Sequence, residues 1–489
     1  MSHLIGYNTG ALHQASSDFN NNISKTYYPS ATDLSENPII PSPDIFDELN
    51  DSHKDNLPTP VQCAVHLELL EAFHALRIKI LDSKKLDKAF NLGEPTKKIY
   101  RRKYIKGLKK HVNEEVTLRN PSWEAKRDKK WTWYLAEAAQ RFLVWAANFN
   151  ACLTSTMGKE GVNDLKTGIS MTDSSWLPPV GEYLSSSTTD TQLTIQQDIL
   201  MIWHAFLLNP FDYLEYCRNQ HWDYLPRVNF PWKLIHDSIT SQGPIRDAWA
   251  VTGKTWEVPE GKAVIPGTLL KSIIQQGNMK THDIGKPYAS RFIGKLVDNV
   301  ERQRVFVEKM NAHLWIRSPA LQGTLRRAVE RYERYLRLFK LYPGKMLVPA
   351  LDIDLVWHTS QLSATAYLNS MEARCGRFIN HDDKIKKSKL AVGNDETQTL
   401  YRIRFGEEYT VCLCWECQAI MSAVEDSADG DEFLGEVPVS GFAETLADKI
   451  LADVQFYRAV ESARRRNHVK LPVRSEDKTH SQNWPLGAQ

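Results

Sequence analysis

The densest group of soft metal ligands in the sequence is a run of three cysteines, Cys412, Cys414 and Cys417. Thiolates at this spacing are typical zinc ligands, and a fourth ligand would complete a tetrahedral site. The candidates for that fourth ligand are Cys375, His381 and Asp383. The alternative is that the three thiols are small buried hydrophobic groups packed around Trp415. The spacing therefore predicts either a structural zinc site or a packed cluster of inert thiols.

A second pattern that could support chemistry is a duplicated Trp-His pair, Trp203-His204 and Trp357-His358, separated by 154 residues (357 − 203). The residues that match at this offset are Asp198 with Asp352, Trp203 with Trp357, His204 with His358, Leu208 with Leu362 and Tyr213 with Tyr367. We therefore expect two pseudo-repeated helical units, at about 131–240 and 320–385, with the tryptophans as buried anchors.

The repeated histidines are candidate catalytic residues. On a helix they point about 100° away from the neighbouring tryptophan, so His204 and His358 can meet near a pseudo-symmetry axis. In the second unit Asp354 lies one helical turn before His358, where its carboxylate can set the imidazole tautomer and raise its pKa. The alternative is that the histidines are buried, hydrogen-bonded core residues, because two histidines without paired carboxylates are too few ligands for a metal.

A strongly basic stretch covers residues 97–130, with thirteen Lys and Arg and four acidic residues, a local charge of +9. The whole chain has a net charge of only +2. This stretch predicts an anionic ligand or partner, with a solvated helix surface as the alternative. Nucleic acid is the less favoured partner because the stretch contains no ladder of aromatic residues for base stacking.

Most of the periodic segments indicate helices, so the fold class is mainly α. Thr59 and Gln62 form a capping-box pattern at the start of one helix. Further helices are expected at 131–149 and 325–339, where apolar residues recur every three or four positions. Residues 401–415 alternate enough to allow a strand pair, which would be a minor β element.

The composition predicts three regions. Residues 1–54 are rich in Ser, Asn, Asp and Pro and are expected to be a disordered arm. Residues 55–424 form a helical domain, and residues 425–489 form a linker, a C-terminal helix from about 443 to 466, and a polar tail. Hydrophobic residues make up 42% and charged residues 25% of the chain, which is ordinary globular usage.

Several protein classes are excluded by the sequence patterns. No run of 18 apolar residues occurs, so no membrane span is expected. The first residues lack a secretory signal pattern, so we expect reduced cysteines and a cytoplasmic or nuclear location. The sequence contains no Gly-x-Ser-x-Gly elbow, phosphate loop, dinucleotide fingerprint or His-Glu-x-x-His motif, which disfavours nucleophilic hydrolases, P-loop NTPases and zincins.

The combination of motifs resembles fungal members of the glycine-rich domain-containing protein-like family. The resemblance spans about residues 58–422. Besides the Trp-His repeats it is carried by TPVQCAVHLELLEAFHALR (59–77), LPRVNFPWKLIHDSI (225–239), RFINHDDKI (377–385) and RFGEEYTVCLCWECQAI (404–420). The resemblance implies an intracellular helical interaction or scaffold protein with an unknown protein or small-molecule partner. This chain has only 24 glycines and no glycine-rich tract.

The alternative function is an enzyme of fungal secondary metabolism that uses the repeated histidines or a bound metal. Some relatives are described as 2-oxoglutarate-dependent dioxygenases, which need two histidines, a carboxylate and an arginine. His381, Asp383, His468 and Arg474 are the nearest match. An Fe(II)/2-oxoglutarate cofactor is not favoured, because that fold is a β-barrel. The segment around His381 is also typical of a helix N-terminus before Ile385.

Overall fold

The computed structural model describes residues 41, 43–51, 57–89, 92–157, 169, 197–241, 291–381, 387–428, 448, 450–459 and 461. The fold is mainly α, as predicted. The helices are α2 (Pro60–Asp82), α3 (Lys84–Ala89), α4 (Pro121–Met157), α5 (Gln197–Leu207), α6 (Pro210–Asn219), α7 (Trp232–Ser241), α10 (Arg291–His313), α11 (Leu321–Leu341), α12 (Leu351–Gln361), α13 (Ala364–Cys375), α14 (Lys387–Phe405) and α15 (Trp415–Ala428). Short 3-10 turns are η2 (Pro43–Phe46), η3 (Lys106–Leu108), η6 (Leu225–Arg227) and η7 (Trp315–Arg317).

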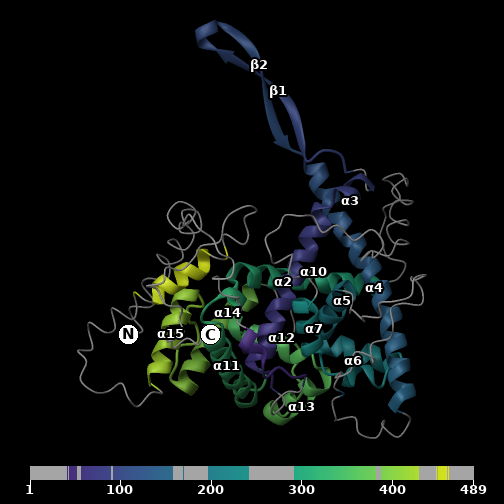
Figure 1. The fold of residues 1–489 in the computed structure, drawn as a ribbon, viewed down its shortest axis with the longest axis vertical. Helices are drawn as coiled ribbons and strands as arrows, with labels where there is room; N and C mark the ends of the chain where they lie inside the picture. Colours follow the sequence, from purple (N-terminus) through teal and green to yellow (C-terminus); the bar gives the residue numbers. More distant parts are fainter. Residues whose placement is uncertain are drawn as a thin grey trace.

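Helix α2 occupies the centre of the helical body (Figure 1). It begins as predicted: the Gln62 amide N–H donates to Thr59 Oγ1 at 3.2 Å, and the Thr59 N–H donates to Gln62 Oε1 at 3.0 Å. The helix contacts α4, α5, α7, α10, α11 and α12. Because it packs against neighbours on nearly every side, α2 is apolar around most of its circumference.

Helix α4 begins at Pro121, ten residues before the predicted start at Trp131. Its first turns are held to the end of α2 and to α3 by charged groups. The Lys130 ammonium is buried and donates to Leu81 O at 2.7 Å and to Asp87 Oδ1 at 2.6 Å. These contacts fix the angle at which α4 leaves the body.

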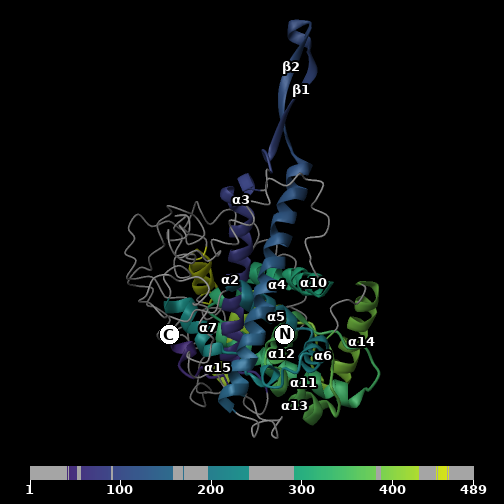
Figure 2. The same cartoon turned by 90° about the vertical axis from the view of Figure 1, so that its right-hand side faces the viewer.

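Between α3 and α4 the chain forms a β-hairpin of two ten-residue strands, β1 (Thr96–Ile105) and β2 (Lys110–Arg119). The strands are antiparallel, with Thr96 opposite Arg119 and Ile105 opposite Lys110. Figures 1 and 2 show the hairpin projecting far beyond the helices. The alternative of a solvated helix surface is therefore wrong for residues 96–119, because the dense charge masked an alternation of apolar residues that is typical of strands.

The predicted strand pair at 401–415 is wrong. Residues up to Phe405 belong to α14, and α15 begins at Trp415, with no strand in the described residues between them. Tyr401 is buried and lies against Phe405 one helical turn later, with ring centroids 4.8 Å apart, whereas Ile403 is 71% exposed. Tyr401 and Phe405 are spaced by one helical turn, but with Ile403 between them they also fit the two-residue alternation of a strand.

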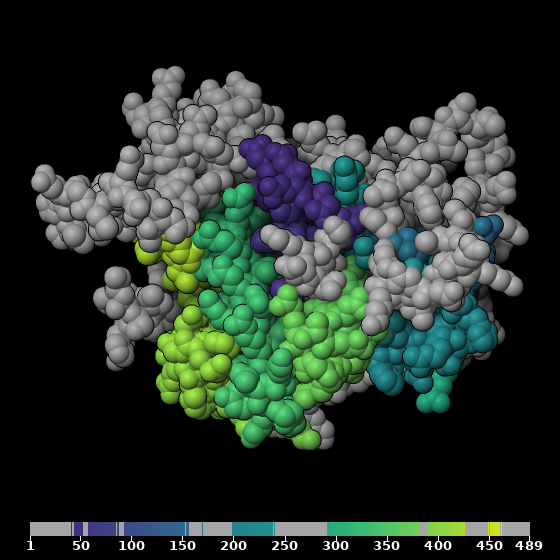
Figure 3. Space-filling view, turned by 90° about the horizontal axis from the view of Figure 1, so that it is seen from below, coloured from purple at the N-terminus to yellow at the C-terminus, as the bar shows by residue number. Residues whose placement is uncertain are grey.

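Segments that are distant in sequence share one surface of the body. Figure 3, seen from below, shows the purple N-terminal segment beside green and yellow-green segments of the C-terminal half, in agreement with the contacts of α11 with both α2 and α15. Helix α15 continues through the predicted domain boundary at 424. Residues 450–459 are helical, within the predicted C-terminal helix. The predicted arm lies mostly outside the described residues.

Among the described residues, no helix is both long enough and apolar enough to cross a bilayer.

Candidate functional site

The first Trp-His segment is helix α5, and its tryptophan is a buried anchor. Trp203 is 1% exposed, and its indole N–H donates to the Tyr213 hydroxyl at 3.5 Å. The Tyr213 hydroxyl donates in turn to Leu225 O at 3.5 Å. Asp198, at the start of α5, pairs with Arg141 of α4. One hydrogen-bonded chain therefore ties α5 to α6 and η6, and one ion pair ties it to α4.

The second Trp-His segment, helix α12, has the same arrangement. The buried Trp357 donates to the Tyr367 hydroxyl at 3.0 Å, and that hydroxyl donates to Ile379 O at 2.5 Å. Asp352 accepts from Arg331 Nε of α11 at 2.7 Å. Both tryptophans are thus buried in helices, as predicted.

The helices that precede the two segments also match. Trp145 of α4 lies against Trp203 and against Phe149, with centroid distances of 5.2 Å in both cases. Tyr335 and Phe339 of α11 each lie 5.7 Å from Trp357. In both helices an arginine is followed by an aromatic residue four positions later and by Phe after another four. These contacts support the predicted duplication, which stays a prediction.

The histidine of the first unit is bonded inside the core. His204 Nε2 lies 2.9 Å from Nε2 of His66, which α2 contributes and which is fully buried. His66 Nδ1 lies 2.8 Å from Thr359 Oγ1, and that hydroxyl donates to Leu355 O. Because the Thr359 proton is used, His66 Nδ1–H must donate to Thr359, and His204 Nε2–H must donate to His66 Nε2. The four groups form one directional hydrogen-bonded chain.

Burial keeps these two histidines neutral. Desolvation first, and then the charge of His358, lower the pKa of His204 to about 3. The pKa of His66 also lies well below its usual value, because of burial first and then of His204 and His358.

The histidine of the second unit lies in a cluster with Asp354 and His381. His358 Nε2 is 3.5 Å from Asp354 Oδ1, His381 Nε2 is 3.2 Å from the same oxygen, and the two Nε2 atoms are 3.4 Å apart. Burial alone would raise the pKa of Asp354, but His358, His381 and Lys309 together bring it below its ordinary value. Asp354 retains 22% side-chain exposure, so solvent reaches this cluster.

The predicted candidate residues therefore divide between two clusters. His358 and Asp354 come together as predicted, whereas His204 pairs with His66. His381, a predicted partner of the cysteines, instead lies against Asp354.

Residues 274–370 match the model of the glycine-rich domain-containing protein-like family, a range that includes α12 with Asp354 and His358. This match covers 97 of the 489 residues, so it is a similarity of one segment of the chain to that family. The chain is 28% identical over 247 residues to Glycine-rich domain-containing protein 1 of Arabidopsis thaliana, covering 48% of this chain and 28% of the relative. It is 26% identical over 287 residues to Glycine-rich domain-containing protein 2 of the same plant, covering 56% and 33%.

The chain thus spans a third or less of the length of these two glycine-rich domain-containing proteins. No solved structure matches it.

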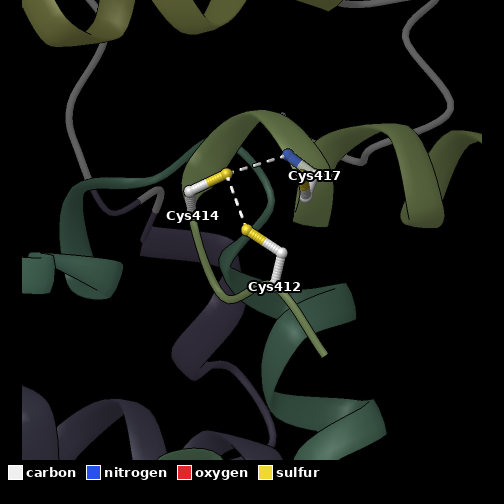
Figure 4. Close-up of side chains that lie close together, drawn as sticks. All are labelled: Cys412, Cys414 and Cys417. Carbon is white, nitrogen blue, oxygen red and sulfur yellow. Dashed lines mark hydrogen bonds between the residues drawn. The ribbon is translucent and has the colours of Figure 1, made fainter. Parts of the chain in front are cut away.

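The cysteine cluster lies at the start of α15 (Figure 4). Cys412 Sγ and Cys414 Sγ are 3.3 Å apart, and the Cys417 amide lies 3.4 Å from Cys414 Sγ. All three sulfurs lie within 4.8 Å of one another. Hydrogen bonding to Cys412 is the largest cause that raises the pKa of Cys417, to about 11. The three sulfurs therefore lie on the same side of the turn, close to one another.

The predicted fourth ligands are not at this cluster. The Cys375 thiol is buried and donates to Leu336 O at 3.6 Å, and His381 lies against Asp354. Asp383 lies outside the described residues, as do His468 and Arg474 of the oxygenase pattern and the segment 382–386, where a helix N-terminus was expected. Among the described residues, no fourth protein ligand lies close to these three thiols.

A small pocket opens beside His204, between α2, α4, α5 and α10. Phe73, Met201 and Val307 contribute its apolar wall. The His358 side chain does not line it, so the histidines of the two units do not converge in this pocket.

Sequence reasoning missed His66, which completes the first cluster. The available signal was its position on the buried face of α2, one turn after Gln62 and at helical spacing from Leu69 and Phe73. A histidine on such a face must find a partner inside the core.

Proposed function

We propose that this chain is a helical interaction protein that docks on an anionic membrane surface through the hairpin β1–β2. The observation that carries this proposal is the hairpin itself: its two strands lie outside the core and its residues 96–119 contain nine Lys and Arg against two Glu, a charge of +7. An isolated two-stranded hairpin is marginally stable in water. A partner that covers its surface would supply the missing stabilisation.

The acidic residues of the hairpin do not offset its charge. Glu115 pairs with Lys98 at 2.6 Å and Glu114 with Lys103 at 3.1 Å, both across the strands. These pairs stabilise the register but leave a large excess of cations. An anionic surface is therefore the complementary partner.

The distal end favours lipid over nucleic acid. Tyr104, Ile105 and Leu108 are 50%, 37% and 58% exposed there. They are surrounded by lysines, namely Lys103, Lys106, Lys109 and Lys110. An exposed leucine makes no favourable contact with the phosphates of nucleic acid. An aromatic ring, aliphatic groups and lysines together suit the interface between lipid headgroups and acyl chains. Anionic lipids such as phosphatidylserine are enriched in the cytoplasmic leaflet of membranes, which agrees with the expected cytoplasmic location.

Vesicle binding tests this function. The full chain should bind phosphatidylserine-containing vesicles, not pure phosphatidylcholine vesicles, and more weakly as salt rises. The triple variant Lys106→Gln, Lys109→Gln, Lys110→Gln should lose about 3 kcal/mol, roughly 100-fold in affinity, at about 1 kcal/mol per lysine.

A matched control carries the same charge change on α14, as Lys389→Gln, Arg402→Gln and Arg404→Gln, all exposed side chains. Equal losses in both triple variants, or absence of vesicle binding at low salt, would refute docking through the hairpin. Binding of duplex nucleic acid through the same three lysines, without vesicle binding, would replace lipid by nucleic acid as the partner.

An interaction role also fits the interior. The Trp–Tyr–carbonyl chains and the His204–His66 pair are internal bonds that hold helices together, and they suit a duplicated scaffold. Among the described residues, the feature that supports the enzyme alternative is the cluster of Asp354, His358 and His381.

A further inference from the structure

We propose that Asp354, His358 and His381 form a binding site for one divalent transition-metal ion. The inference is independent of the membrane docking proposed above. It rests on which atoms converge, on the distances between them, and on a comparison of the two Trp-His units.

The three ligand atoms come from two segments that other contacts hold in place. Asp354 and His358 are one turn apart on α12, so they share a helix face. His381 follows α13 after a turn at Gly376, whose φ is +71°. Its ring packs edge-on against Trp357 at 4.7 Å, and the bond from Tyr367 to Ile379 O fixes the backbone two residues earlier. The site is therefore preorganised by contacts outside the three ligands.

The distances fit a metal centre. Ligand atoms bonded to one ion at about 2.0–2.2 Å and at tetrahedral angles lie about 3.3–3.6 Å apart. The three edges of the triangle measured here are 3.2, 3.4 and 3.5 Å. An ion near the centre of this triangle would bond both Nε2 atoms and Oδ1 without rearrangement of the helices.

The fold itself does not require this cluster. The first unit has the same chain from tryptophan to tyrosine to a backbone carbonyl, yet Leu200 occupies the position that corresponds to Asp354. Two residues after the accepting carbonyl of Leu225, where the second unit has His381, the first unit has Arg227. The shared scaffold thus forms without an aspartate or a second histidine, which points to a separate role for these residues.

The ligand set selects the class of ion. Two imidazoles and one carboxylate suit zinc or ferrous iron, whereas calcium and magnesium prefer oxygen ligands. The three side chains are 3%, 12% and 22% exposed for His358, His381 and Asp354. The partial exposure leaves room on one side for solvent to complete the coordination shell, as in sites with three protein ligands.

Metal titration of the full chain, stripped with chelator, tests the site. Co²⁺ and Zn²⁺ are the probes, because Co²⁺ bound by nitrogen and oxygen shows only d–d absorption, whereas thiolate ligands add a sulfur-to-cobalt charge-transfer band. We expect one ion per chain without that band at this site. Asp354→Asn and His381→Gln should each weaken it by roughly 100-fold or more, beyond the 10–100-fold typical for loss of a second-shell partner.

The matched control is His204→Gln, which removes a buried histidine of the first unit and should leave the affinity unchanged. Circular dichroism verifies that each variant is folded. Three outcomes overturn the proposal: no binding by the unmodified chain, unchanged binding in both Asp354→Asn and His381→Gln, or a single bound ion that is lost only in Cys412→Ser.

Discussion

Truncation of Trp357 should be among the most destabilising single changes in this protein. Its ring is 4% exposed and packs against Tyr335, Phe339 and His381, and its N–H donates to Tyr367 at 3.0 Å. Deletion of a large buried aromatic ring costs about 3–5 kcal/mol. Since a domain is stable by only about 5–15 kcal/mol, Trp357→Ala should remove a large share of that stability.

The variant Trp357→Phe separates packing from hydrogen bonding. It keeps an aromatic ring but removes the indole donor, a change worth about 1 kcal/mol. The Tyr367 hydroxyl keeps its bond to Ile379 O, so no polar group is orphaned. Trp203→Phe should cost less for the hydrogen bond, because the corresponding distance to Tyr213 is 3.5 Å.

Urea unfolding followed by tryptophan fluorescence and far-ultraviolet circular dichroism measures these differences. A Trp357→Ala variant with the unfolding midpoint of the unmodified chain would show that the ring is not a core anchor, and the reasoning on both units would fail. Trp357→Ala should also weaken metal binding at His381, whereas Trp203→Ala should not.

The helical elements were largely predictable, because their signals are local. The capping box at Thr59 and the apolar stripe that became α11 depend on residues three or four positions apart. The hairpin was missed although its apolar side chains alternate, because Ile99, Val112 and Val116 are few among many charged residues. Charge density was interpreted as a helix surface, whereas a strand surface fits the same residues.

The candidate site was predictable only within a helix. Asp354 and His358 follow from a spacing of four residues, so their proximity was correctly expected. Their contact with His381, and that of His204 with His66, join positions 27 and 138 residues apart. Such contacts depend on how α13 returns to α12 and how α2 crosses α5, and no local pattern encodes either arrangement.

Three further predictions concern the buried histidines, the buried Arg331–Asp352 pair and the cysteine cluster. Below pH 6.5 the unfolded chain protonates His66 and His204, whereas the folded core keeps both neutral. The free energy of unfolding should therefore fall by about 1.4 kcal/mol per histidine for each pH unit that the pH is lowered. His204→Gln should reduce that slope, as measured by urea unfolding at several pH values. Arg331→Met should cost about 3–5 kcal/mol in urea unfolding by leaving Asp352 buried and unpaired, and Asp352→Asn in the same chain should restore part of that loss. The cysteine cluster should bind zinc, because sulfurs within 4.8 Å of one another can reach one ion. When Co²⁺ is used in place of zinc, Cys414→Ser should abolish the thiolate-to-cobalt absorption band. If the unmodified chain shows no such band, the thiols are inert packing residues.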